Sequence, residues 1–276
     1  MTAVAGRTHH WQMLGSGLIE EHLAWCRLRG LADTTIASKR DLLRRLACQV
    51  NLATATSRDL EAWWTGRDIA ITTRAMEVAH VATFYRWLVL TERRPDDPML
   101  KVPKPKVPRP LPRPADEREV AAMIAGAPHP IRDWLTLAAY AGLRAIEIAR
   151  LRGDDLVAGT LLIRAGKGGK GRIVPAHPRV LEVAASWPAA GMIWQTPTGL
   201  EVDAHYVSQT TNKWLRDHGR SATLHQYRAR FATQAYNACH DLRAVQELLG
   251  HTSPATTQRY VAVPNDAAAR AVAGLS

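Results

Sequence analysis

A run of closely spaced prolines divides the sequence and limits what either part can fold into. Eight of the 16 prolines lie between Pro95 and Pro114. Proline lacks a backbone N–H and holds φ at roughly −65°, so no regular helix continues through such a run. We therefore predict a first domain at residues 1–94, a linker at residues 95–114 and a second domain at residues 115–276.

The linker is also basic. Polyproline geometry extends by about 3.1 Å per residue, so the segment is long enough to cross a DNA duplex. In that position Lys101, Lys104 and Lys106 would face phosphate groups. A plain spacer between domains is the alternative, and both interpretations hold together because a spacer along DNA gains from positive charge.

The charge of the whole chain favours a polyanionic partner. Its 276 residues include 36 Lys and Arg against 25 Asp and Glu, a formal net charge of +11. Nucleic acid is the first partner to test, and a basic solvated surface is the alternative. The 3 cysteines are widely and irregularly spaced, which fits reduced thiols rather than disulfides or a zinc site. Without a long apolar run or a signal-peptide pattern, we expect a cytoplasmic, nucleoid-associated protein with no membrane partner.

Apolar residues recur at helical spacing in the first domain, which predicts a bundle of four or five helices. Thr34 and Thr35 are candidate caps of the second helix, and Ser57 is the candidate start of the third. The arginines on the polar faces are candidates for contacts with a DNA groove, and a solvated helix face explains each of them equally well. These arginines are Arg40, Arg44 and Arg74.

The second domain is predicted to mix helices with a small sheet. Two strands, Thr160–Ile163 and Arg172–Pro175, flank a glycine-rich turn. Helical patterns precede them at residues 117–124 and 131–151, the latter interrupted at Ala141 and Gly142. Further helical patterns follow at residues 207–218, 226–239, 242–249 and 254–260. The fold class is thus mainly α with a small β-sheet.

Six side chains on separate segments together supply what phosphodiester transesterification needs without a metal or cofactor. Arginines bind two phosphate oxygens at once, a tyrosine is a nucleophile, and histidine or lysine transfers protons. Each residue alone has an ordinary explanation, such as an ion pair between Arg144 and Glu147 three positions apart. The six are Arg144, Lys167, His225, Arg228, His251 and Tyr260.

Four segments of the second domain resemble the conserved boxes of the tyrosine recombinases, which include phage integrases and Xer recombinases. They read AGLRAIEIARL at 141–151, GKGGKGRIVP at 166–175, HQYRARFAT at 225–233 and LLGHTSPATTQRY at 248–260. Two details depart from the family pattern. Ala229 stands where many members have histidine, and the glycine-rich turn leaves open whether Lys167 or Lys170 is the conserved lysine; its position after the first glycine favours Lys167.

The resemblance implies a role for each residue. Arg144 and Arg228 would hold the scissile phosphate, with Glu147 orienting Arg144. Tyr260 would attack phosphorus and leave a 3′-phosphotyrosine. Lys167 would protonate the departing 5′ oxygen, His225 would accept the tyrosine proton, and His251 would donate a hydrogen bond to a phosphate oxygen.

The resemblance also implies a helical core-binding domain and an α+β catalytic domain that form a C-shaped clamp on double-stranded DNA. Four copies would exchange strands at specific core sites through a Holliday junction, with a possible recombination directionality factor as a further partner. Integration or excision of a phage or mobile element is the first expectation. The alternatives are chromosome dimer resolution by a Xer-type enzyme, a type IB topoisomerase-like activity, and a catalytically silent DNA-binding protein.

Overall fold

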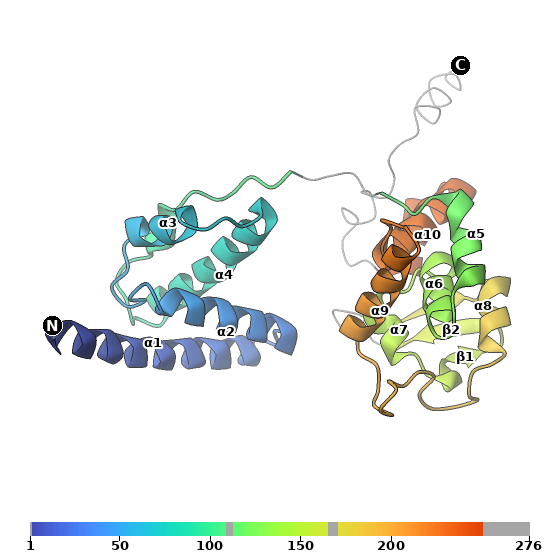
Figure 1. Ribbon diagram of the computed structural model, residues 1–276, viewed down its shortest axis with the longest axis horizontal. Helices are drawn as coiled ribbons and strands as arrows, with labels where there is room; N and C mark the ends of the chain where they lie inside the picture. The colour runs from blue at the N-terminus through green and yellow to red at the C-terminus, as the bar shows by residue number, and fades with distance from the viewer. Residues whose placement is uncertain (1, 109–112, 165–170, 251–276) are drawn as a thin grey trace, which may run out of the picture. The chain divides into compact units, whose positions relative to one another are not determined.

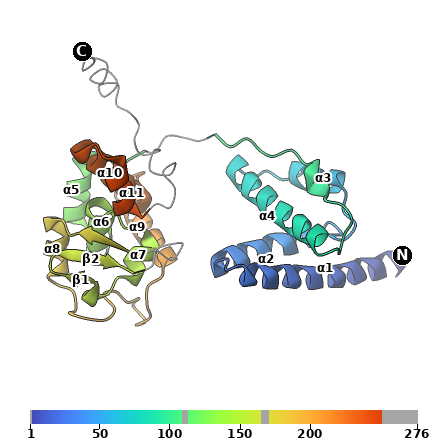
Figure 2. The ribbon, with the colours of Figure 1, turned by 180° about the vertical axis from the view of Figure 1, so that it is seen from behind.

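The computed structural model describes residues 2–108, 113–164 and 171–250, with side chains from residue 15 onward. The chain divides into two compact units, Met1–Arg109 and Pro110–Ser276. Each unit has its own buried apolar cluster. The two units are shown in Figure 1 and from behind in Figure 2.

The described part of the first unit is helical. Helices α1 and α2 run side by side in both views (Figures 1 and 2). The apolar faces of the helices of this unit enclose a core in which Leu23, Leu43 and Phe84 have no exposed surface. This agrees with the helical periodicity of the sequence. The elements are α1 (Thr2–Leu28), α2 (Asp33–Ala47), α3 (Ser57–Thr65), α4 (Ile71–Leu90) and the 3-10 helix η1 (Pro98–Leu100).

One of the two predicted helix starts is wrong and the other is confirmed. Helix α2 begins at Asp33 after Ala32, which provides no side-chain cap, so the predicted caps Thr34 and Thr35 lie inside the first turn and that prediction is wrong. Helix α3 begins at Ser57 as predicted, and the preceding residue Thr56 caps it. The Thr56 N–H donates to Asp59 Oδ2 at 2.8 Å, and the Asp59 N–H donates to Thr56 Oγ1 at 3.3 Å. Reciprocal bonds of this kind satisfy N–H groups that have no partner within the helix.

The first residues of the proline-rich segment pack on the first unit. Asp97 Oδ1 accepts from the Met99 N–H at 2.9 Å at the start of η1. Met99 and Val102 are buried in the same cluster as the four helices. Beyond them Lys104 and Lys106 are exposed, as is Lys101.

The second unit is built around helix α6, whose residues Trp134, Leu135 and Leu137 have no exposed surface. Helices α5, α8, α9 and α10 pack against it (Figure 1). The helical elements are α5 (Glu117–Gly126), α6 (Ile131–Tyr140), α7 (Ala145–Arg150), the 3-10 helix η2 (Gly153–Asp155), α8 (Pro178–Ala184), α9 (Ala204–Asp217), α10 (Leu224–Cys239) and α11 (Leu242–Leu249).

The predicted interruption at Gly142 separates α6 from α7. Gly142 has φ of 65°, a left-handed conformation that L side chains rarely adopt. A Cβ at this position would overlap the ring of Phe231 on α10. The chain can therefore turn sharply here, close to α10, only because residue 142 is glycine.

The sheet has three antiparallel strands in the order β1-β2-β3. They are β1 (Leu156–Val157), β2 (Thr160–Ile163) and β3 (Arg172–Pro175). Leu161 pairs with Val174, and both are buried against α6 and its neighbours. Ile163 pairs with Arg172, which places the Arg172 side chain on the same inner face. Strand β1 and helix α8 are additions to the predicted elements, because two and seven residues are too short for a readable periodicity.

Candidate active site

Arg144 and Glu147 form the start of helix α7. Arg144 occupies the N-cap position, and its backbone N–H donates to Glu147 Oε2 at 2.7 Å. Its guanidinium Nη1 donates to Glu147 Oε1 at 2.8 Å. The Glu147 side chain is 1% exposed, whereas that of Arg144 is 28% exposed. The carboxylate thus holds the backbone and the side chain of Arg144 from the buried side.

Two further arginines approach the same carboxylate. Arg172 donates from Nη1 and Nη2 to the two Glu147 oxygens, at 2.7 and 3.0 Å. Arg228 Nη1 lies 3.6 Å from Glu147 Oε2. Burial raises the pKa of Glu147, but hydrogen bonds and charge from Arg172, the Arg144 N–H and the charge of Arg228 outweigh burial and lower it to about 2. Glu147 is therefore ionised and the cluster keeps an excess of positive charge.

The same three arginines bind the end of helix α11. Arg172 Nε donates to the carbonyl of Leu248 at 2.7 Å, and Arg228 Nη2 to that of Leu249 at 2.8 Å. Arg144 Nη2 lies 3.4 Å from the Gly250 carbonyl oxygen. The last carbonyls of a helix accept no hydrogen bond from within the helix and carry partial negative charge, so arginine N–H groups are suitable donors to them. Three successive carbonyls are thereby tied to one arginine cluster.

Helix α10 supplies His225 and Arg228. His225 is exposed in the first turn of the helix, after the N-cap Thr223. Arg228 is only 2% exposed, and its Nη1 also donates to the carbonyl of Gly142. The glycine turn, helix α10 and the end of α11 are thus joined through one guanidinium. Of the predicted catalytic set, the structure brings Arg144, Glu147 and Arg228 together.

The remaining predicted catalytic residues lie outside the described residues. These are Lys167, its alternative Lys170, His251 and Tyr260. Residues close to them in the sequence are described, and these belong to the arginine cluster or contact it. Arg172 follows Lys167 by five positions, and Gly250 directly precedes His251.

Arg172 and Arg230 were not among the site residues predicted from the sequence. Arg230 is buried; its Nε donates to Glu117 Oε2 at 2.6 Å and its Nη1 to the Ala139 carbonyl at 3.0 Å, which ties α10 to α5 and α6. For Arg172 a signal was present. Strand side chains alternate between faces, so Arg172 falls on the side of the apolar Val174, where a charged residue requires a buried partner.

The candidate DNA-binding arginines of the first unit have partners within that unit. Arg40 Nε and Arg44 Nη2 lie 3.3 and 3.1 Å from Glu20 Oε1. Arg74 Nη2 donates to the Arg67 carbonyl at 3.0 Å. The side chain of Arg44 is 61% exposed, so it remains accessible to a phosphate in addition to Glu20.

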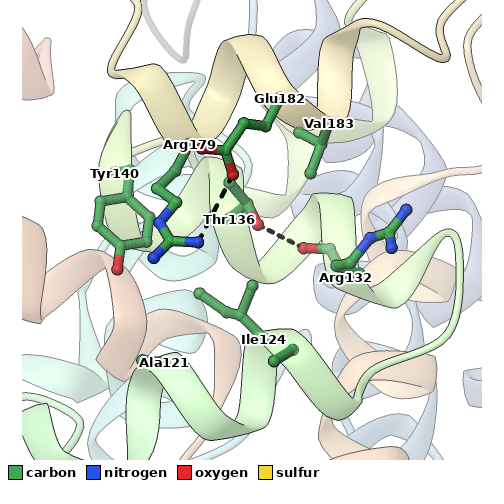
Figure 3. A pocket seen from close by; sticks show the side chains of 9 residues that line it. Ala121, Ile124, Arg132, Thr136, Tyr140, Arg179, Glu182 and Val183 are labelled. Carbon is green, nitrogen blue, oxygen red and sulfur yellow. Dashed lines mark hydrogen bonds and ion pairs between the residues drawn. The ribbon is translucent and has the colours of Figure 1, made fainter.

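A cavity of about 220 Å³ lies elsewhere in the second unit, between α5, α6 and α8 (Figure 3). Ile124 and Thr136 line it, and Arg179 pairs with Glu182 at its edge at 3.5 Å. It contains none of the predicted catalytic residues. Across the described ranges no group of three or more His, Cys, Asp or Glu is arranged to hold a metal ion. Nor does any helix there have both the length and the apolar character to cross a membrane.

The chain has relatives among known protein sequences. Residues 115–266 match the phage integrase family. A tyrosine recombinase XerC from Erythrobacter litoralis is 33% identical over 94% of this chain and 90% of its own length. Another XerC, from Rhodospirillum centenum, is 34% identical over 69% of this chain and 62% of its own length. The chain thus aligns with less than two thirds of that second relative.

Solved structures share the fold. The Tn1549 transposon integrase in complex with a circular intermediate DNA gives a TM-score of 0.73 at 16% identity, over 94% of this chain and 99% of that chain. A lambda integrase dimer bound to a core site gives 0.73 at 17% identity, over 89% and 94%. The predicted fold class, mainly α with a small sheet, is confirmed. By the family match over residues 115–266 and the 33% identity to a XerC of which it covers 90%, the chain belongs to the phage integrase family of tyrosine recombinases.

Proposed function

We propose that this protein is a site-specific DNA recombinase that cuts and rejoins strands through a 3′-phosphotyrosine at Tyr260. One observation carries the proposal. Arg144, Arg172 and Arg228 surround a single carboxylate next to the end of α11, so positive charge exceeds negative charge where the chain leads into His251 and Tyr260. A cluster of this kind suits a phosphodiester, whose transition state carries additional negative charge.

The proposed cleavage step needs only side chains. The Tyr260 oxygen attacks phosphorus, His225 accepts the phenol proton, and the bond from phosphorus to the 5′ oxygen breaks. Lys167 gives its proton to the departing oxygen, and His251 donates a hydrogen bond to a phosphate oxygen. The phosphotyrosine retains an ester bond, so attack by a new 5′ hydroxyl rejoins the strands without an energy-rich cofactor.

Arg144 and Arg228 would bind the phosphate from different depths. The Arg144 side chain is 28% exposed and can meet a phosphate directly. Arg228 is buried and bonded to the carbonyls of Gly142 and Leu249, so the phosphate would have to approach more deeply to reach its guanidinium. Glu147 would keep both cations oriented.

The proposed substrate is double-stranded DNA carrying specific core sites. The first unit and the basic residues Lys101, Lys104 and Lys106 would bind the duplex together with the second unit, as a clamp. A lambda integrase has been solved as a tetramer bound to a Holliday junction, which supports four copies and a junction intermediate here. We place the activity in the cytoplasm at the nucleoid, and a directionality factor would select integration or excision of a phage or mobile element.

A Xer-type role in resolving chromosome dimers is the second candidate, favoured by the similarity to XerC sequences along most of the chain. The two roles differ in their DNA sites. Sequencing the junctions formed when the protein acts on genomic DNA from its own source distinguishes them. Junctions at the ends of a mobile element indicate an integrase, and junctions at a single chromosomal locus indicate dimer resolution.

A duplex with a nick close to the cleavage site tests the chemistry, because the short cleaved fragment diffuses away and religation is prevented. Wild-type protein should become covalently attached to the 3′ end, and Tyr260→Phe should bind the same DNA without attachment. Binding by both proteins without any covalent product would indicate a silent DNA-binding protein. Relaxation of supercoils without exchange between two sites would indicate a topoisomerase-like enzyme.

A further inference from the structure

Arg172 lies at the start of β3, and all three nitrogens of its guanidinium are engaged. Its side chain is 8% exposed. Nη1 and Nη2 each donate to one oxygen of Glu147, and Nε donates to the carbonyl of Leu248. A planar guanidinium with two parallel bonds to a carboxylate fixes the orientation of both groups, which an ammonium group cannot do.

These bonds connect three separate segments of the second unit. Arg172 belongs to β3, Glu147 to α7, and Leu248 to the end of α11. The chain leading to β3 contains Lys167, and the chain leaving α11 continues into His251. Arg172 therefore links the start of β3 and the end of α11 to the Glu147 carboxylate, which also binds Arg144. The segments that contain Lys167 and His251 adjoin these two places in the sequence.

Arg172 also shares an oxygen with Arg144. Glu147 Oε1 accepts from Arg172 Nη1 at 2.7 Å and from Arg144 Nη1 at 2.8 Å. The end of α11 accommodates Arg172 closely. Gly250 has φ of 61°, and a Cβ there would lie 3.0 Å from Arg172 Nη1. The position of the Glu147 carboxylate, and through it that of Arg144, thus depends on Arg172.

We propose that Arg172 is a positioning residue for DNA cleavage, which acts through Glu147 and the Leu248 carbonyl rather than by touching the phosphate. This inference rests on the proposed recombinase function. In this role Arg172 aligns Arg144 with the two segments that contain Lys167 and His251. Loss of the two-pronged contact should slow the chemical step while leaving DNA binding nearly intact.

Arg172→Lys in the full-length protein tests this, with the nicked duplex as substrate. Lysine retains the buried charge but cannot bind both Glu147 oxygens and the Leu248 carbonyl in the same geometry. We expect covalent attachment to slow by about tenfold or more, with DNA affinity changed by less than about threefold. Arg243→Gln is the matched control, because Arg243 lies on exposed α11 surface and pairs only with Glu247 among the ion pairs of the described chain. Its attachment rate should equal that of wild type.

A double-mutant cycle separates positioning from an independent structural effect. If Arg172 acts through Glu147, Arg172→Lys in the Glu147→Gln background should slow attachment by less than about threefold further. If the two substitutions acted independently, their fold-reductions in attachment rate would multiply. Arg172→Gln adds a pH readout, because without Arg172 the pKa of Glu147 should rise from about 2 toward or above its ordinary 4.5. The ratio of the wild-type rate to the Arg172→Gln rate should then increase as the pH falls.

The outcomes distinguish this inference from the proposed function. Absence of covalent product with wild type, or its persistence in Tyr260→Phe, rejects the recombinase function itself. Wild-type attachment together with an equal rate in Arg172→Lys rejects the positioning role, as does a fully multiplicative double-mutant cycle. Thermal unfolding of each variant is measured to establish that it folds. If Arg172→Gln does not fold, Arg172→Lys decides the matter, since it preserves the charge that Glu147 requires.

Discussion

Arg228 Nη1 lies 3.6 Å from Glu147 Oε2, and the two side chains are 2% and 1% exposed. An ion pair so deeply buried persists only when hydrogen bonds satisfy the remaining donors and acceptors. Here the Gly142 and Leu249 carbonyls accept from Arg228, while Arg144 and Arg172 donate to Glu147. The stability of the second unit and the geometry of its proposed active site therefore depend on the same contacts.

Glu147→Gln should destabilise the protein strongly. Gln keeps the shape of the side chain but leaves Arg172 and Arg228 buried without a counter-charge, which costs about 3 kcal/mol when one partner of a buried pair is removed. Urea unfolding with a probe in the second unit measures the change. Glu182→Gln is the control, because its pair with Arg179 is exposed and should contribute less than about 0.5 kcal/mol. Equal stabilities of the two variants would contradict the role of Glu147.

The first unit should lose stability in mild acid because of His22. This side chain has no exposed surface, and burial with the nearby charge of Lys39 lowers its pKa from 6.5 to about 4. The unfolded chain therefore binds a proton that the folded chain excludes. Above pH 6.5 His22 is neutral in both states and does not lower the free energy of unfolding. As the pH decreases toward 4, the free energy of unfolding falls by up to about 3 kcal/mol because of this residue.

Urea unfolding of the full chain between pH 7 and pH 4, followed with a probe in the first unit, measures this effect. The variant His22→Leu lacks the titrating group, so its midpoint should depend less on pH in this window. Glu147 contributes at lower pH, because its pKa of about 2 lies below the ordinary 4.5. Its stabilisation is present above pH 4.5 and is lost as the pH falls toward 2. An equal slope for wild type and His22→Leu would refute the assignment to His22.

Gly142→Ala should disturb both fold and activity. The left-handed φ of 65° and the overlap of a Cβ with Phe231 together should cost about 3 kcal/mol. Gly219→Ala is the matched control. Gly219 has φ of 73° but nothing lies within 4 Å of a Cβ there, so only about 1 kcal/mol is expected. Phe231→Leu should recover part of the loss at position 142, and an absence of recovery would argue against the steric explanation.

The glycine-rich turn offers two candidate proton donors, and a modified substrate separates them. Lys167→Ala should slow cleavage of ordinary DNA by about 100-fold, because the 5′ oxygen then leaves without a proton. A substrate with sulfur in place of that bridging oxygen needs no proton, so the same variant should cleave it at nearly the wild-type rate. Lys170→Ala should match wild type on both substrates. The reverse pattern would assign the proton transfer to Lys170.

Much of the architecture could be predicted from the sequence, because it depends on local preferences. The proline run separates the two units, and the helical periodicity predicts α5, α10 and α11 nearly to the residue. Gly142 correctly marks the break between α6 and α7, since only glycine tolerates that conformation beside Phe231. The four boxes likewise indicated the family, because their residue types, spacing and order can be read directly from the sequence.

Other features depended on the tertiary structure. Arg172 and Leu248 are 76 positions apart, and nothing in either segment specifies their contact. The pairing arises because the sheet and the end of α11 pack at one place, where a buried guanidinium must find acceptors. Likewise α2 begins at Asp33 after Ala32 rather than after the predicted caps Thr34 and Thr35, since a cap depends on the backbone conformation at that residue. Sequence periodicity thus determined the elements, and residue types in the four boxes determined the candidate chemistry, whereas packing decided which charges share the Glu147 carboxylate.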